Sequence, residues 1–107
     1  MNITKQANDQ GLTYEEFLDI VHVFIDTSRH DLERMRDALA REDAEDAVQA
    51  AHSLKGAAGN LGFDDLYDTA LEAEKCARAS DLARMPQFVN RLDDQLKQLI
   101  SSAGNAN

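Results

Sequence analysis

Several residue types that shape other proteins are scarce in this chain of 107 residues. It has one cysteine, one proline and no tryptophan, and aromatic residues make up 6% of it. The single cysteine, Cys76, excludes an internal disulfide and favours a reducing compartment, so we expect a cytoplasmic protein. No apolar run approaches the roughly 20 residues that a membrane-spanning helix needs. The first ten residues, MNITKQANDQ, lack the apolar core of a signal peptide.

Positive charge is also in short supply. The chain has 11 Lys and Arg residues against 20 Asp and Glu residues, which gives a net charge of −9. Nucleic acids and anionic membrane surfaces attract basic faces, so this balance argues against both as partners. Hydrophobic residues make up 43% of the chain and charged residues 29%, which is typical of one globular domain. Abundant Ala, Leu, Glu, Asp, Arg and Gln, without β-branched runs, favour helices.

Hydrophobic periodicity and end signals predict four helices. The first begins after Thr13, which has the spacing of a capping box with Glu16, and ends by about Arg41. Asp43 is the expected N-cap of the second helix, and Gly62 its expected end.

The third predicted helix runs over about residues 64–79, and the last carries Pro86 in its first turn. Four amphipathic helices joined by short connections predict an all-α fold, an up-down-up-down antiparallel four-helix bundle over residues 13–102. Residues 1–12 are expected to form a flexible polar tail, and residues 103–107 to fray.

The stretch AHSLKGAAGNLGF, residues 51–63, carries three glycines within a predicted helix. An interior glycine destabilises a helix by about 0.8–1 kcal/mol relative to alanine. On a helical wheel, His52, Gly56 and Gly59 point away from the apolar positions of this helix. We interpret the two glycines as a bare patch on the solvent side, where the surface of a partner can approach the histidine closely.

The neighbours of His52 suggest further roles. Val48 lies one turn earlier on nearly the same face and offers an apolar contact, while Lys55 lies one turn later on the flank. Gly62 suits a left-handed position at the end of the helix, and we expect it to be structural. Asn60 is a second candidate for capping the same helix end.

The segment from His52 to Gly62 resembles the signature of histidine-containing phosphotransfer (HPt) domains, H-x-x-K-G-[SA]-[SA]-x-x-[LIV]-G, and meets every specified position. The resemblance extends over about residues 14–100. Glu74 in the third predicted helix also matches, whereas Ser80 stands in a turn where the family often has glycine. The family acts in multistep two-component phosphorelays.

This resemblance implies that His52 accepts a phosphoryl group through Nε2 from the aspartyl phosphate of a receiver domain and passes it to another receiver. Lys55 would supply positive charge, and Val48, Gly56 and Gly59 would border the docking surface. The Mg²⁺ would belong to the receiver, so we expect no cofactor and no metal in this chain. A hybrid histidine kinase is the expected upstream partner, and the chain is expected to act as a monomer.

The chain has no ATP-binding motif such as G-x-x-x-x-G-K-[ST], so we expect a phosphocarrier rather than an enzyme. Two other functions stay open: a receiver-binding module that carries no phosphate, and the N-terminal phosphoacceptor fragment of a chemotaxis-type histidine kinase. His22, Asp26 and His30 have a helical spacing, but they drift across the outer side of their helix and do not predict a metal site. The residue that orients Nδ1 of His52 is not identified by the pattern.

Overall fold

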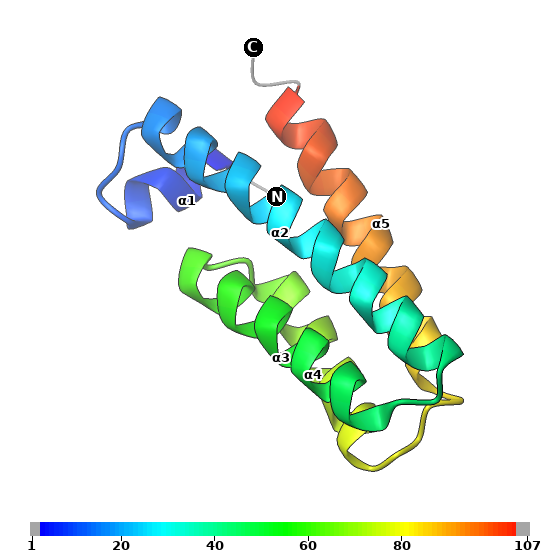
Figure 1. Ribbon diagram of the computed structural model, residues 1–107. Helices are drawn as coiled ribbons and strands as arrows, with labels where there is room; N and C mark the ends of the chain where they lie inside the picture. The colour runs from blue at the N-terminus through cyan, green and yellow to red at the C-terminus, as the bar shows by residue number, and fades with distance from the viewer. Residues whose placement is uncertain (1–2, 105–107) are drawn as a thin grey trace.

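The computed structural model describes residues 3–104, which form five α-helices and no strand (Figure 1). The all-α prediction is confirmed, but the four-helix prediction holds only in part because the N-terminal segment adds a helix. In chain order the helices are α1 (Ile3–Asp9), α2 (Tyr14–Ala40), α3 (Ala44–Leu61), α4 (Asp64–Arg78) and α5 (Met85–Gly104).

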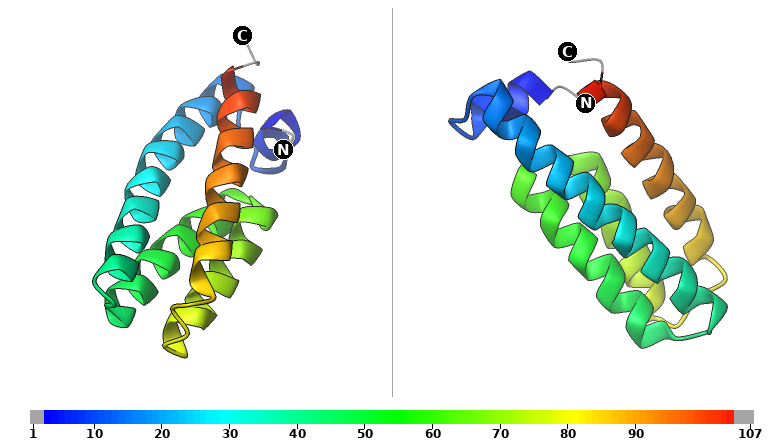
Figure 2. Two further views of the ribbon diagram at one scale, coloured as in Figure 1. Left: turned by 90° about the vertical axis from the view of Figure 1, so that its right-hand side faces the viewer. Right: turned by 45° about the horizontal axis from the view of Figure 1, so that its top comes forward.

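The four long helices lie side by side, and the chain reverses direction at each connection between them (Figures 1 and 2). Helix α3 packs against α2 and α4, and α5 contacts α4 and α2, so the four helices enclose one core. Helix α1 packs on α2 at the end of the bundle where α3 ends. None of the helices in residues 3–104 has the length and apolar character that crossing a membrane requires.

The core is formed by the apolar stripe of each long helix. Three aromatic rings meet in it: the ring of Phe63 lies 6.1 Å from that of Phe17 and 5.2 Å from that of Phe24, measured between centroids. On α3, by contrast, most of the fully buried side chains are methyl groups, because the inner face of this helix is formed by Ala47, Ala50, Ala51, Leu54 and Ala58. Small side chains allow helices to approach closely, so α3 lies tightly against its two neighbours.

The predicted helix starts are present. Thr13 and Glu16 form a complete capping box at the start of α2, because Thr13 Oγ1 accepts a hydrogen bond from the Glu16 N–H and Glu16 Oε1 accepts one from the Thr13 N–H. The side chain of Asp43 accepts a hydrogen bond from the N–H of Asp46 and caps α3. Pro86 is the second residue of α5 and lies in its first turn, as expected.

The predicted polar tails are wrong where they overlap the described residues. Residues 3–9 form α1, and Ile3 and Ala7, one helical turn apart, are buried in the core. Two apolar residues are too few to give a periodic signal among polar neighbours. At the other end α5 continues to Gly104, and Ala103 is buried. Residues 1–2 and 105–107, which the tail predictions also included, lie outside the described residues.

Helix α1 and the turn that follows it satisfy backbone groups at the end of α3. Gln6 Nε2 donates a hydrogen bond to the carbonyl of Gly62, and Gln10 Nε2 donates one to that of Leu61, both at 2.8 Å. Gly62 itself has φ 77° and ψ 22°, and its N–H donates to carbonyls of the last turn. The cap expected from Asn60 is therefore made by Gly62 and the two glutamines, and Asn60 lies exposed.

Gly62→Ala should lower the free energy of unfolding by about 1–2 kcal/mol, because alanine is strained at this φ. The added Cβ would also lie 2.7 Å from Gln6 Oε1, so the side chain of Gln6 would have to move away from residue 62. Gly56→Ala is the matched control, since the added Cβ meets open space within a regular helix and should stabilise the protein by about 0.5–1 kcal/mol. Urea denaturation at pH 7 measures both changes, and equal stability of Gly62→Ala and wild type would contradict the strain.

Candidate functional site

His52 stands on the outer face of α3, as the periodicity of the helix predicts. Ala51 and Leu54 on either side of it are fully buried, and they fix the rotation of the helix. The imidazole consequently projects outward, with 61% of its side chain exposed.

A carboxylate from the neighbouring helix meets this ring. Glu74 of α4 is buried, with 4% of its side chain exposed, and its Oε2 lies 2.8 Å from His52 Nδ1. Lys55 Nζ donates a hydrogen bond to Oε1 at 2.6 Å, and Arg78 Nη2 donates one to Oε2 at 3.0 Å. The spacings i, i+3 on α3 and i, i+4 on α4 place each pair of side chains on one face. One buried carboxylate thus binds three donors from two helices.

These partners keep Glu74 ionised. Burial alone would raise its pKa, but the hydrogen bonds from Lys55, His52 and Arg78 outweigh burial and lower the pKa from 4.5 to about 2. A buried carboxylate with opposite charges and donors around it stays charged at neutral pH.

The contact with Glu74 fixes the orientation and the tautomer of the imidazole. An ionised carboxylate can only accept hydrogen bonds, so Nδ1 carries the proton and donates a hydrogen bond to Glu74. In the neutral ring the lone pair is then on Nε2. Because Nδ1 is turned toward the buried carboxylate, the nucleophilic nitrogen belongs to the exposed part of the ring. Glu74 is therefore the orienting residue that the sequence pattern left unidentified.

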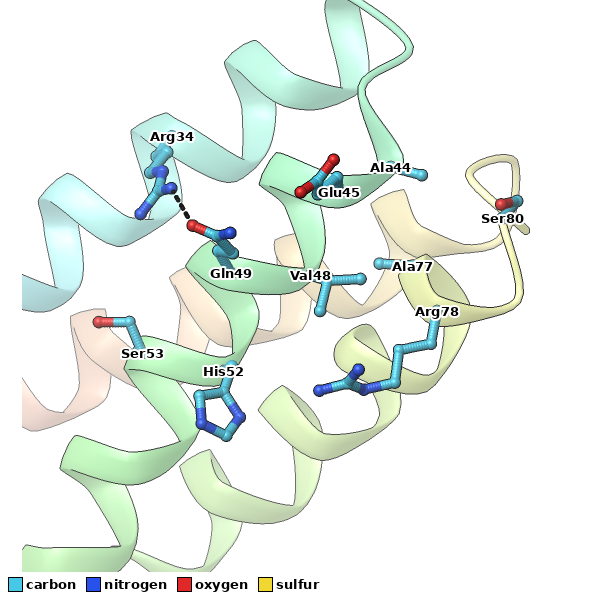
Figure 3. Close-up of a pocket in the computed structure, with 10 residues that line it drawn as sticks. All are labelled: Arg34, Ala44, Glu45, Val48, Gln49, His52, Ser53, Ala77, Arg78 and Ser80. Atoms are coloured by element: carbon cyan, nitrogen blue, oxygen red, sulfur yellow. Dashed lines mark hydrogen bonds between the residues drawn. The ribbon is translucent and has the colours of Figure 1, made fainter.

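An open groove of about 800 Å³ runs from His52 along the N-terminal half of α3 (Figure 3). Val48 and Ala77 supply apolar surface to it, and Arg78 reaches from α4 toward His52. Lys55 is not among the residues that form the groove, which are Arg34, Ala44, Glu45, Val48, Gln49, His52, Ser53, Ala77, Arg78 and Ser80.

The two outer glycines of α3 have different surroundings. A Cβ at Gly56 would meet open space, which agrees with the interpretation of a bare surface beside His52. A Cβ at Gly59 would lie 3.1 Å from the ring of Tyr67 on α4. Gly59 is exposed, as the periodicity predicts, but its missing side chain also makes room for the ring of Tyr67, a role in helix packing that the prediction did not include.

A second polar contact joins α3 to α2 beside the histidine. Asp31 of α2 is buried and accepts a hydrogen bond from Ser53 Oγ at 3.0 Å. Burial raises the pKa of Asp31. No local sequence pattern predicts this contact, since the two residues are 22 positions apart in the chain. Among residues 3–104 no group of side chains is arranged to hold a metal ion, the helical series of His22, Asp26 and His30 included.

Comparisons with known proteins agree with this architecture. The family model described as the Hpt domain matches residues 19–102. The chain is also similar to a solved structure, the crystal structure of histidine-containing phosphotransfer protein B (HptB) from Pseudomonas aeruginosa PAO1. That match has a TM-score of 0.84 and 25% sequence identity, and it covers 94% of this chain and 88% of the other. A search of curated proteins gives no match.

The charge on Glu74 should make stability depend on pH. Its pKa in the folded protein lies below the ordinary 4.5, so its contribution is complete above about pH 4.5 and is lost as the pH falls toward 2. At pH 7 Glu74→Gln should therefore lower the free energy of unfolding by up to about 3 kcal/mol. The difference between the variant and wild type should shrink in acid.

Urea denaturation across pH 2.5–7 measures this difference for each variant. Glu72→Gln is the matched control, because Glu72 is exposed and pairs only at the surface with Lys75, so its loss should change stability by less than about 0.5 kcal/mol. A Glu74→Gln difference that does not vary with pH would contradict the low pKa.

Proposed function

The chain belongs to the Hpt domain family, and from that premise we propose that His52 accepts a phosphoryl group from the aspartyl phosphate of a receiver domain and passes it to a second receiver. Hpt domains are phosphocarrier modules rather than classical enzymes. The observation that carries the proposal is the state of His52: the ring is exposed, and its Nδ1 is held by a buried, ionised carboxylate.

The chemistry follows from this arrangement. The lone pair of Nε2 attacks phosphorus in line with the oxygen that links it to the aspartate of the receiver. The N–P bond forms as the P–O bond breaks, and the electron pair leaves with the carboxylate oxygen. The proton stays on Nδ1, and the charge of Glu74 compensates the positive charge that develops on the ring. Phosphoryl transfer requires alignment and charge neutralisation more than covalent help from the protein.

The remaining parts of the reaction are assigned to the partner. We place the Mg²⁺ on the receiver, which docks over the outer face of α3 with Val48 and Gly56 beneath it. Val48 is half-buried in the groove beside His52, and Gly56 presents backbone without a side chain. A hybrid histidine kinase upstream, a cytoplasmic setting and a monomeric carrier complete the proposal.

His52→Gln should receive no phosphoryl group from a receiver charged with acetyl phosphate and Mg²⁺, because the amide has no nucleophilic nitrogen. Its fold should be unchanged by circular dichroism, since the ring is largely exposed. His22→Gln and His30→Gln, both at exposed positions of α2, are the matched controls and should be labelled as wild type is.

Intact-protein mass spectrometry detects the added phosphoryl group, and acid lability identifies it as phosphohistidine. Labelling of His52→Gln would refute the assignment. A wild-type protein that binds the receiver and never becomes labelled would be a receiver-binding module without phosphate transfer.

Gly56→Glu should reduce the rate of transfer from a charged receiver at least about tenfold, because a charged side chain would occupy the surface on which the receiver docks. The position is open, so the helical content should not fall. Gly56→Ala is the control and should transfer at close to the wild-type rate. Time courses of phosphotransfer measure both rates. If Gly56→Glu transfers at the wild-type rate, the receiver docks on another surface.

A further inference from the structure

Lys55 and Arg78 both lie beside the proposed phosphoacceptor, but they differ in exposure and in the atom that they bind. Lys55 from α3 and Arg78 from α4 both donate hydrogen bonds to Glu74, but to different oxygens and from different degrees of burial. The sequence pattern points to Lys55 as the source of positive charge for the phosphoryl oxygens, whereas the contacts favour the other cation.

Lys55 is bound to the carboxylate of Glu74 and is largely buried. Its Nζ lies 2.6 Å from Glu74 Oε1, and only 19% of its side chain is exposed. It does not line the groove that contains His52. If Nζ moved away to a phosphoryl group, the buried Oε1 would lose its donor, and separating a buried charge from its partner is strongly unfavourable.

Arg78 is placed to contact both groups at once. Its Nη2 and Nδ1 of His52 bind the same oxygen, Glu74 Oε2, so the guanidinium and the imidazole flank one atom. The side chain is 61% exposed and lines the groove together with His52 (Figure 3). A guanidinium has five N–H donors, and the hydrogen bond to Glu74 occupies one of them. The others can bind phosphoryl oxygens while the contact with the carboxylate is kept.

We propose, on the basis of the proposed function, that Arg78 is the cation that binds the phosphoryl oxygens during transfer to His52. Lys55 is then a positioning residue, which keeps Glu74 charged and in place so that Nδ1 stays protonated and Nε2 stays nucleophilic. In the transfer step the N–P bond forms and the P–O bond to the aspartate breaks. The guanidinium of Arg78 neutralises charge on the non-bridging oxygens, while no proton leaves Nδ1.

The test compares Arg78→Ala, Arg78→Lys and Lys55→Met with two phosphodonors. One donor is a charged receiver, and the other is phosphoramidate, a small molecule that needs no docking surface. The tautomer of His52 is followed by ¹⁵N chemical shifts of the imidazole. Arg36→Ala is the matched control. It also removes one guanidinium, but Arg36 lies on α2 and pairs with Asp93 of α5.

With both donors, Arg78→Ala should slow labelling about a hundredfold or more, as the loss of one charge-stabilising donor typically does, while the Nδ1-protonated tautomer is retained. Arg78→Lys should restore part of the rate. Lys55→Met should instead lower stability and reduce the population of this tautomer, with labelling reduced in the same proportion. Arg36→Ala should be labelled as wild type is.

Three results would overturn the inference. If Arg78→Ala is labelled at the wild-type rate, Arg78 does not bind the phosphoryl oxygens. If the variant is slower with the receiver but not with phosphoramidate, Arg78 is a docking residue instead. If Lys55→Met is labelled more slowly while its tautomer and stability are unchanged, Lys55 is the residue that binds the phosphoryl oxygens. Failure of the proposed function is distinct from these, because wild type and Arg36→Ala would then also stay unlabelled by the receiver.

Discussion

The site depends on one buried carboxylate at the interface between α3 and α4. Glu74 is held away from water, and an ionised group there is tolerated only when donors surround it. Its donors are His52, Lys55 and Arg78. The hydrogen bonds that stabilise Glu74 in the interface are therefore the ones that orient the imidazole. A substitution of Glu74 would alter both the stability of the interface and the reactivity of His52.

Helix α3 serves this arrangement with two contrasting faces. Its inner face is mostly alanine, so the backbone lies close to α2 and α4 and the side chain of Glu74 can reach the ring. Its outer face carries Gly56, where nothing covers the backbone, and Gly59, where Tyr67 of α4 packs in. A helix weakened by glycine is supported at its end by Gly62, by Gln6 of α1 and by Gln10 in the turn after α1, whose side chains bind its last carbonyls.

The charge near His52 differs from the charge of the molecule. The chain as a whole is acidic, with a net charge of −9, yet Arg34 and Arg78 both line the groove beside the histidine. Arg34 is bound to Asp46 and Gln49 within the α2–α3 interface, whereas Arg78 faces the ring. The groove is also lined by Glu45, so the exposed cation that adjoins the ring is Arg78, and its guanidinium suits a ligand with anionic oxygens, such as a phosphoryl group.

Local features of the fold are determined by the sequence itself. The caps at Thr13 and Asp43, the left-handed end at Gly62 and the outward direction of His52 follow from side chains within a few residues of each other, because capping and helical periodicity act over one or two turns. Helix α1 lacks such a local signal, because its burial involves only two apolar residues, Ile3 and Ala7, and its hydrogen bond from Gln6 to Gly62 spans 56 positions of the chain.

The contacts that give the site its chemistry belong to the fold. Glu74 was visible only as part of a resemblance, and its hydrogen bond to His52 spans 22 positions between two helices. The partner of Lys55, the approach of Arg78 and the space beside Gly59 depend likewise on how α4 lies against α3. A periodic pattern fixes which way a side chain points from its own helix, but the atom that it meets is set by the distance and rotation of the neighbouring helix.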